Sequence, residues 1–237
     1  MRTSALGALS IIVVGLAGIA WFWLELTPPR LGFDDTDSPA VSLRFLRAHP
    51  EIYAQAGVSL MLLAIALTVA TFVVFDAAAS RSDSLALRSL SAIGLFSAAF
   101  FFMHGVLRFS AEPLLYIDGL DHAWGEAAYV AVQMVGIHGF AQAGAFALCA
   151  WVVGLSLIGL RTGIIPVALC ALAVVPAFRL IGLSVAPFVD LPEVLWIISI
   201  AAIPIVMLWC ILLGLILVRR GAVASQDDRS VLAPVSG

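Results

Sequence analysis

The sequence predicts an all-α fold, a polytopic membrane bundle of six transmembrane helices with both termini in the cytoplasm. Hydrophobic residues make up 62% of the 237 residues and charged residues only 11%, whereas soluble domains carry about 25% charged residues. Mean hydropathy is +1.10. Six apolar runs are each long enough to span a bilayer, because a hydrocarbon layer about 30 Å thick needs about 20 helical residues.

The apolar runs lie at roughly 4–24, 56–76, 89–108, 139–160, 164–186 and 194–218, and we expect residues 1–218 to form one transmembrane domain. The first run is too long for a signal peptide and no small-residue cleavage site follows it, so we expect it to be retained. A single helix from Asp121 to Arg161 would be about 60 Å long, twice the membrane thickness. We therefore expect a break near Gly136 and Gly139, with 121–137 as a surface helix. The same residues could instead extend the fourth span.

The first outer loop, at about 25–55, is the longest polar segment between spans. Ser38 before Pro39 predicts an N-cap followed by proline at the first helical position. The short helix that follows would place Val41, Phe45 and Leu46 on one side. Pro50 can begin the next helix in the same way. After the last span, residues 219–237 are small and polar, which predicts a disordered cytoplasmic tail.

Arginine counts in the connections predict the orientation, because cytoplasmic loops carry the excess of basic residues. The chain has no lysine. With the N-terminus inside, four arginines fall outside, Arg30, Arg44, Arg47 and Arg108, against seven inside, Arg2, Arg81, Arg88, Arg161, Arg219, Arg220 and Arg229. The outer regions are then 25–55, 109–137 and 187–193. These features, with an all-arginine composition typical of GC-rich genomes, predict a multi-pass protein of a bacterial cytoplasmic membrane.

Polar residues inside the spans gather toward the outer side. Counted along ideal helices from the cytoplasmic boundary, His104 lies about 22 Å up, Arg179 about 24 Å, Gln142 about 28 Å and His138 about 34 Å. Two stripes follow helical spacing: Ser97, Phe101, His104 and Arg108 on the third span, and His138, Gln142, Ala145 and Cys149 on the fourth. If these faces pack together, both histidines and Gln142 meet near the outer surface.

Two interpretations of the polar residues remain open. In the first, His104, His138 and Gln142 are buried polar groups that tie membrane helices together by hydrogen bonds. Arg108 and Arg179 then lie near helix ends and reach the headgroups. Alternatively, these same five residues line an outward-facing pocket for a small or amphiphilic ligand, as in a transporter, a sensor or an accessory subunit.

Arg179 is the ionised residue most expected to have a specific partner, because it is deep and follows the kink predicted at Pro176. Pro204 predicts a second kink, in the sixth span. The candidate acceptors for Arg179 are the Leu172 carbonyl and five outer carboxylates, Asp118, Asp121, Glu126, Asp190 and Glu193.

Redox or metal chemistry is the alternative function. His104 and His138 could be axial ligands of one haem, and His104, His122 and His138 with Asp118 or Asp121 have the residue types of a metal site. No ligand pair has a characteristic close spacing, so the sequence assigns no metal, cofactor or catalytic residue.

The sequence contains no P-loop or glycine-rich nucleotide fingerprint, and nothing predicts nucleic-acid binding. Cys149, Cys170 and Cys210 lie in apolar runs and read as core residues.

The turn between the fourth and fifth runs, "GLSLIGLRTGIIPVAL", places Arg161, Thr162, Gly163 and Pro166 between two apolar helices. It resembles the R-S/T-G-x-x-P turn in a family of six-span bacterial membrane proteins catalogued only as a domain of unknown function. The span count and the long first outer loop also fit that family. The resemblance implies a fold but no activity.

Overall fold

The computed structural model describes residues 5–27, 31, 38–78, 84–111, 122–185 and 193–231, and the regular structure in these ranges is entirely helical. Five helices are long and apolar enough to cross a membrane: Leu6–Glu25, Pro50–Asp76, Leu85–Ser110, Trp124–Thr162 and Ile197–Arg220. A sixth apolar helix, Val167–Gly182, is shorter. The prediction of an all-α polytopic membrane protein is therefore confirmed, with five of the six expected spans present as long helices.

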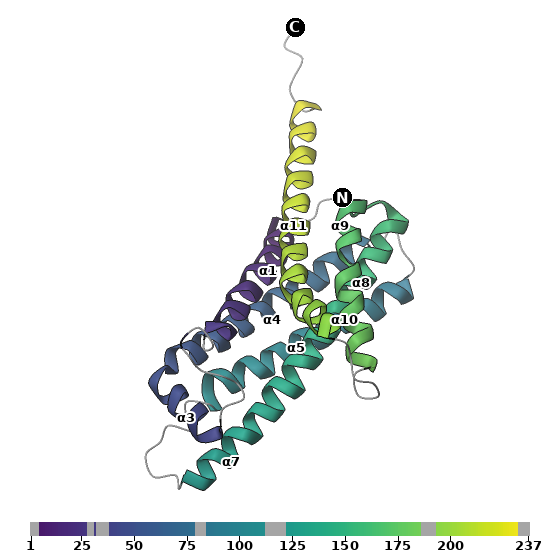
Figure 1. The fold of residues 1–237 in the computed structure, drawn as a ribbon. Coiled ribbons are helices and arrows are strands. Elements are labelled where there is room, and N and C mark those ends of the chain that lie inside the picture. The colour runs from purple at the N-terminus through teal and green to yellow at the C-terminus, as the bar shows by residue number, and fades with distance from the viewer. Residues whose placement is uncertain are drawn as a thin grey trace.

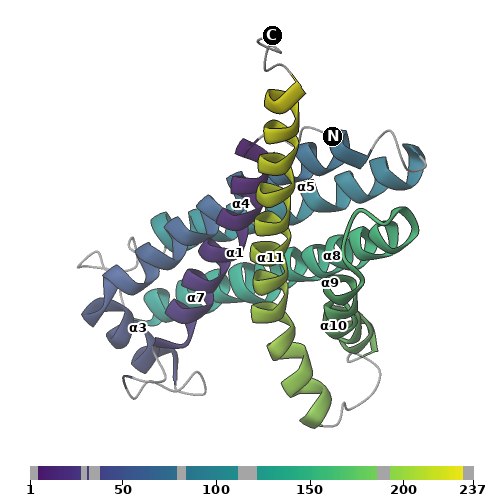
Figure 2. The same ribbon diagram turned by 90° about the horizontal axis from the view of Figure 1, so that it is seen from above.

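The contacts between six helical segments form a closed ring, and Figures 1 and 2 show these segments from two directions. Each contacts the next in the order α1 (Ala5–Glu25), α4 (Pro50–Ala78), α5 (Ser84–Val106), α8 (Gln142–Thr162), α10 (Val174–Val185) and α11 (Glu193–Val231), and α11 closes the ring on α1. The inner faces supply the main apolar core, in which Trp151 and Trp209 meet edge to face. The Trp209 indole N–H donates to the Leu169 carbonyl at 3.0 Å. Cys149, Cys170 and Cys210 are buried and free, as expected of core residues.

The fourth span differs from expectation, because no break separates it from the residues before it. α7 (His122–Gln133), the π-helix η2 (Met134–Ala141) and α8 follow one another without interruption. The helix is wound more loosely at Gly136 and Gly139, where the break was predicted. Glycine weakens a helix, but no proline removes a backbone donor here, so the chain widens into a π turn instead of ending.

The fifth apolar segment is split. α8 ends at Gly163, whose φ of 67° is in the left-handed region that favours glycine. Pro166 then caps α9 (Val167–Leu172). Ala173 interrupts the helix before α10 begins, so the break lies one turn ahead of Pro176. The Arg220 guanidinium donates to the Ile164 carbonyl, which joins α11 to this turn.

A small cap covers one end of the bundle. α3 (Pro39–Ala48) has Ser38 as its N-cap residue and proline at the first position, and α4 begins at Pro50, as predicted. The buried face of α3 is centred on Leu43 and Leu46, whereas Val41 and Phe45 are half-buried. A second apolar cluster joins α3 to the start of α4 and to Tyr129 of α7. α7 thus packs against α3 as part of the cap and is not a separate surface helix.

α11 continues beyond the predicted end of the last span at 218 and stays helical to Val231, with Pro204 inside it. Figure 1 shows it projecting past the other helices toward the C-terminus. The segment expected to be a disordered tail is therefore helical up to that residue. Residues 222–231 contain neither glycine nor proline to end the helix, while 232–237 lie outside the described residues.

Candidate polar site

An ion pair joins α5 to α1. Arg108 Nη2 lies 3.0 Å from both carboxylate oxygens of Glu25. The arginine side chain is only 3% exposed and the glutamate side chain 30%. Arg108 follows α5 in the short π-helix η1 (Leu107–Ala111), and Glu25 is the last residue of α1. Arg108 does not extend toward the headgroups as expected, because its guanidinium is buried and paired with Glu25.

Two aromatic residues complete the surroundings of this pair. The Trp21 indole N–H donates to Glu25 Oε1 at 3.0 Å, one turn below it on α1. The Arg108 guanidinium carbon lies 4.9 Å from the centre of the Tyr53 ring, close enough for a cation–π contact. Trp21 also packs edge to face against Phe101 of α5. Three helices are thus connected through one charge pair.

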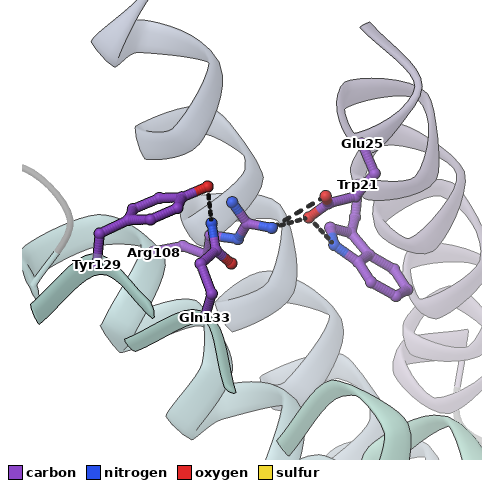
Figure 3. A network of polar contacts seen from close by, with 5 residues as sticks. All are labelled: Trp21, Glu25, Arg108, Tyr129 and Gln133. Carbon is purple, nitrogen blue, oxygen red and sulfur yellow. Dashed lines mark hydrogen bonds and ion pairs between the residues drawn. The ribbon is translucent and has the colours of Figure 1, made fainter. Parts of the chain in front are cut away.

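A third polar group flanks Arg108 from α7. The Gln133 side-chain amide donates to the Tyr129 hydroxyl at 2.9 Å. Figure 3 shows Arg108 between this pair on one side and Glu25 with Trp21 on the other. The arginine therefore sits where α1, α4, α5 and α7 converge, and it does not face open solvent.

Arg179 forms a second buried centre. Its guanidinium donates to the Gln142 side-chain oxygen at 2.9 Å, and to the carbonyl and hydroxyl oxygens of Ser199 at 2.6 and 3.1 Å. The residue is 4% exposed. The prediction of a specific partner is confirmed, but among the described residues the acceptors are neutral oxygens of α8 and α11. Asp118, Asp121 and Asp190 lie outside the described residues, as does the Glu193 side chain. Neither Glu126 nor the Leu172 carbonyl is among the hydrogen-bond partners of the Arg179 guanidinium, which are Gln142 and Ser199.

The predicted stripe on the third span is buried as expected. Ser97 and Phe101 are 0% exposed, and His104 and Arg108 are 2% exposed. The Ser97 hydroxyl donates to the Gly144 carbonyl of α8 at 2.8 Å. A methyl group added to Gly136 would lie 3.1 Å from His104 Nδ1. α5 therefore packs against the fourth span through the predicted face, with glycines opposite its larger side chains.

The predicted stripe on the fourth span is wrong at its N-terminal end. His138 is exposed, and Gly136 occupies the position facing His104. The π turn accounts for the shift, because its i to i+5 bonding adds a residue to the turn and rotates the residues before it by about 100° relative to α8. Ala145 and Cys149, beyond the π turn, are buried as expected.

This placement gives no support to shared haem ligation, since His104 is buried while His138 lies on the surface. No group of three or more His, Cys, Asp or Glu residues suited to a metal ion occurs within the described ranges. The His122 side chain is not among the described parts. His49 lies in the cap, 3.5 Å from Glu51.

A groove lies between α1 and α4, and none of the buried polar residues described above lines it. It is an open groove of about 690 Å³, lined by Leu16, Ile19, Ala20, Trp23 and Leu24 of α1 and by Ala54, Gln55, Val58 and Ser59 of α4. Inside the ring, a void of about 10 Å³ lies between apolar side chains of α1, α5, α8 and α11.

Comparisons with known proteins add no name to this arrangement. No family model, no curated protein and no solved structure matches the chain. The resemblance of the Arg161 to Pro166 turn to a family of unknown function therefore stays a prediction.

Replacing Arg179 with lysine tests the second centre. Arg179→Lys should lower the free energy of unfolding by about 1 to 2 kcal/mol, because one ammonium group cannot reproduce the fork that reaches Gln142 and Ser199 together. Arg161→Lys is the matched control at an exposed position and should change stability by less than about 0.5 kcal/mol. Equal effects of the two changes in thermal denaturation would contradict the observed bonding.

Proposed function

We propose that this chain binds an amphiphilic molecule of the outer membrane leaflet in the groove between α1 and α4. The observation that carries the proposal is the groove itself, whose volume of about 690 Å³ lies within the range of about 300 to 1,000 Å³ typical of small-molecule sites. Its lining is almost wholly apolar and comes from two membrane-spanning helices, so the occupant suited to it is a lipid acyl chain.

The polar residues take a different role in this proposal. Arg108 and Arg179 are engaged by partners on neighbouring helices, and the central void is too small for an organic ligand. The five predicted ligand residues, His104, Arg108, His138, Gln142 and Arg179, therefore do not line the proposed binding groove. The buried residues among these five join neighbouring helices of the ring, whereas the groove lies on the outside of the ring.

The groove also occupies a defined stretch along the two helices. Its residues on α1 end at Leu24, next to Glu25, and those on α4 begin at Ala54, one turn after the cap. Exposed Trp23 stands at the same end, where tryptophan prefers the membrane interface. An acyl chain would therefore lie with its polar end near Gln55 and the cap and its tail toward Leu16.

Filling the groove tests this function. Ala20→Trp should reduce photo-cross-linking of a diazirine fatty acid in bilayer vesicles by about tenfold, which corresponds to a loss of about 1.4 kcal/mol in binding. Ala99→Trp is the control, because Ala99 is exposed on α5 and does not line the groove. Equal labelling of both variants and of the unchanged protein would reject the groove as a binding site.

The topology belongs to the same proposal. α9 and α10 together cover 167–185, about 28 Å of helix, which nearly equals the hydrocarbon thickness. Counting this split segment gives six crossings and puts both termini on one side. The arginine excess then makes that side cytoplasmic and the cap external. The bacterial cytoplasmic membrane is the location we propose.

Thiol labelling tests the orientation. In a background without the three natural cysteines, Ser38→Cys in the cap should react with a membrane-impermeant reagent in intact cells, whereas Ser225→Cys on α11 should react only after lysis. Labelling of Ser225→Cys but not of Ser38→Cys in intact cells would invert the topology. Equal labelling of both variants in intact cells would mean an odd number of crossings and would remove the sixth.

A further inference from the structure

Two of the long apolar helices carry an arginine where they end, on the side of the bundle away from the cap. The span Trp124–Thr162 has Arg161 next to its last residue, and the span Ile197–Arg220 ends on Arg220 itself. Figure 1 shows the turn after α8 and the projecting part of α11 at the end of the molecule away from α3 and α7. Both arginines are exposed, and the ends of membrane spans lie at the depth of the lipid headgroups.

One hydrogen bond brings the two arginines to the same turn. Arg220 Nη1 donates to the carbonyl of Ile164, three residues after Arg161. Three residues of chain reach at most about 11 Å, a distance that two long side chains can close around a shared ligand. Between them lies Gly163, where an added methyl group would meet nothing within 4 Å in the described part of the chain. The turn is therefore open, and a bound group has room on it.

This turn carries positive charge that the helices forming it do not balance. Within the described ranges, Arg161 makes no hydrogen bond or ion pair, and Arg220 makes only the bond to Ile164. Residues 127–189 and 194–226 contain neither aspartate nor glutamate. The C-terminus of α8 contributes only about half a negative charge, so two guanidinium groups leave the turn cationic.

We propose that the phosphate of an anionic membrane lipid binds at the turn between α8 and α9, held by Arg161 and Arg220. A guanidinium group presents paired N–H donors in one plane, which match the oxygens of a phosphate. Basic sites between membrane helices bind anionic headgroups in this way, while the acyl chains lie along the spans. The groove between α1 and α4 includes neither arginine, so the two sites can be tested separately.

Arg219 distinguishes a defined site from a general attraction of arginines to anionic membranes. It is exposed and adjacent to Arg220, but successive helical residues point about 100° apart. Its side chain therefore leaves α11 in a different direction from the one that reaches Ile164. Membrane charge alone would make Arg219 and Arg220 equivalent, whereas a site on the turn requires Arg220.

Native mass spectrometry of the full chain, released from detergent that holds equal amounts of phosphatidylglycerol and phosphatidylcholine, tests the site. The unchanged protein should retain phosphatidylglycerol preferentially. Arg161→Gln and Arg220→Gln should each reduce this preference about fivefold, which corresponds to about 1 kcal/mol per arginine. Arg220→Lys should reduce it as well, because an ammonium group lacks the planar fork. Arg219→Gln is the matched control and should change it by less than about twofold.

A soluble competitor identifies the source of the phosphate. Glycerol phosphate at the same concentration as the lipid should not displace it, because glycerol phosphate lacks the acyl chains that pack against the apolar spans. Displacement by glycerol phosphate would assign the turn to a soluble phosphate and overturn the lipid site. Equal effects of Arg219→Gln and Arg220→Gln, or no lipid preference in the unchanged protein, would overturn it too.

Discussion

Glu25→Ala should lower the free energy of unfolding by about 3 kcal/mol, although Glu25 stands at the end of its helix. The change leaves the Arg108 guanidinium, 3% exposed, without its carboxylate, and breaking a buried pair by removing one partner costs about 3 to 5 kcal/mol. The lower end of that range applies because the glutamate side chain is 30% exposed. Denaturation in detergent or bilayer discs measures the loss.

Glu51→Ala is the matched control for this change. Glu51 is also a glutamate at a helix end on the cap side, but its side chain is 57% exposed. Its removal should alter stability by less than about 0.5 kcal/mol. A loss below about 1 kcal/mol for Glu25→Ala would mean that Arg108 reaches water or headgroups instead.

Gly105→Ala should cost about 2 to 3 kcal/mol, because the backbones of α4 and α5 touch at this point. A methyl group on Gly105 would lie 2.8 Å from the Gly57 carbonyl oxygen, and one on Gly57 would lie 2.8 Å from the Gly105 carbonyl oxygen. These atoms belong to backbone and cannot rotate away, so the helices must separate.

Gly125→Ala on α7 provides the contrast, since its added methyl would meet only Leu43 at 3.9 Å. It should leave stability unchanged or raise it by up to about 1 kcal/mol through helix propensity. Thermal denaturation of the two variants side by side measures the difference, and similar melting temperatures would contradict the close helix crossing.

Periodicity and capping chemistry predicted much of this fold. Ser38 and Pro39 begin α3 where expected, and the stripe from Ser97 to Arg108 is buried along its whole length. These features depend on residues within a few turns of one another, for which ideal helical geometry is a sound guide. The same geometry failed at His138, because a π turn cannot be recognised from spacing and every residue before it changes face.

The partners of Arg108 and Arg179 could not be predicted from residue spacing along the sequence. Arg108 and Glu25 are 83 residues apart, so their pairing depends on which helices are neighbours in the ring. One signal was present: Glu25 and Arg108 each end an apolar run on the same predicted side of the membrane, and equal predicted depth makes opposite charges candidate partners. For Arg179, Gln142 lay at a similar predicted depth, but the sequence did not single out Gln142 and Ser199 as its partners, since amide and hydroxyl acceptors are common in membrane helices.

The central claim is that buried polar residues in the part of the bundle nearest the cap pair across helices and hold the ring closed. The most direct test is a double-mutant cycle of Glu25→Gln and Arg108→Gln, measured as unfolding free energies in one bilayer system. We predict a coupling of at least about 1.5 kcal/mol, with the double variant more stable than the sum of the single losses implies. Losses that add within about 0.5 kcal/mol would contradict the claim.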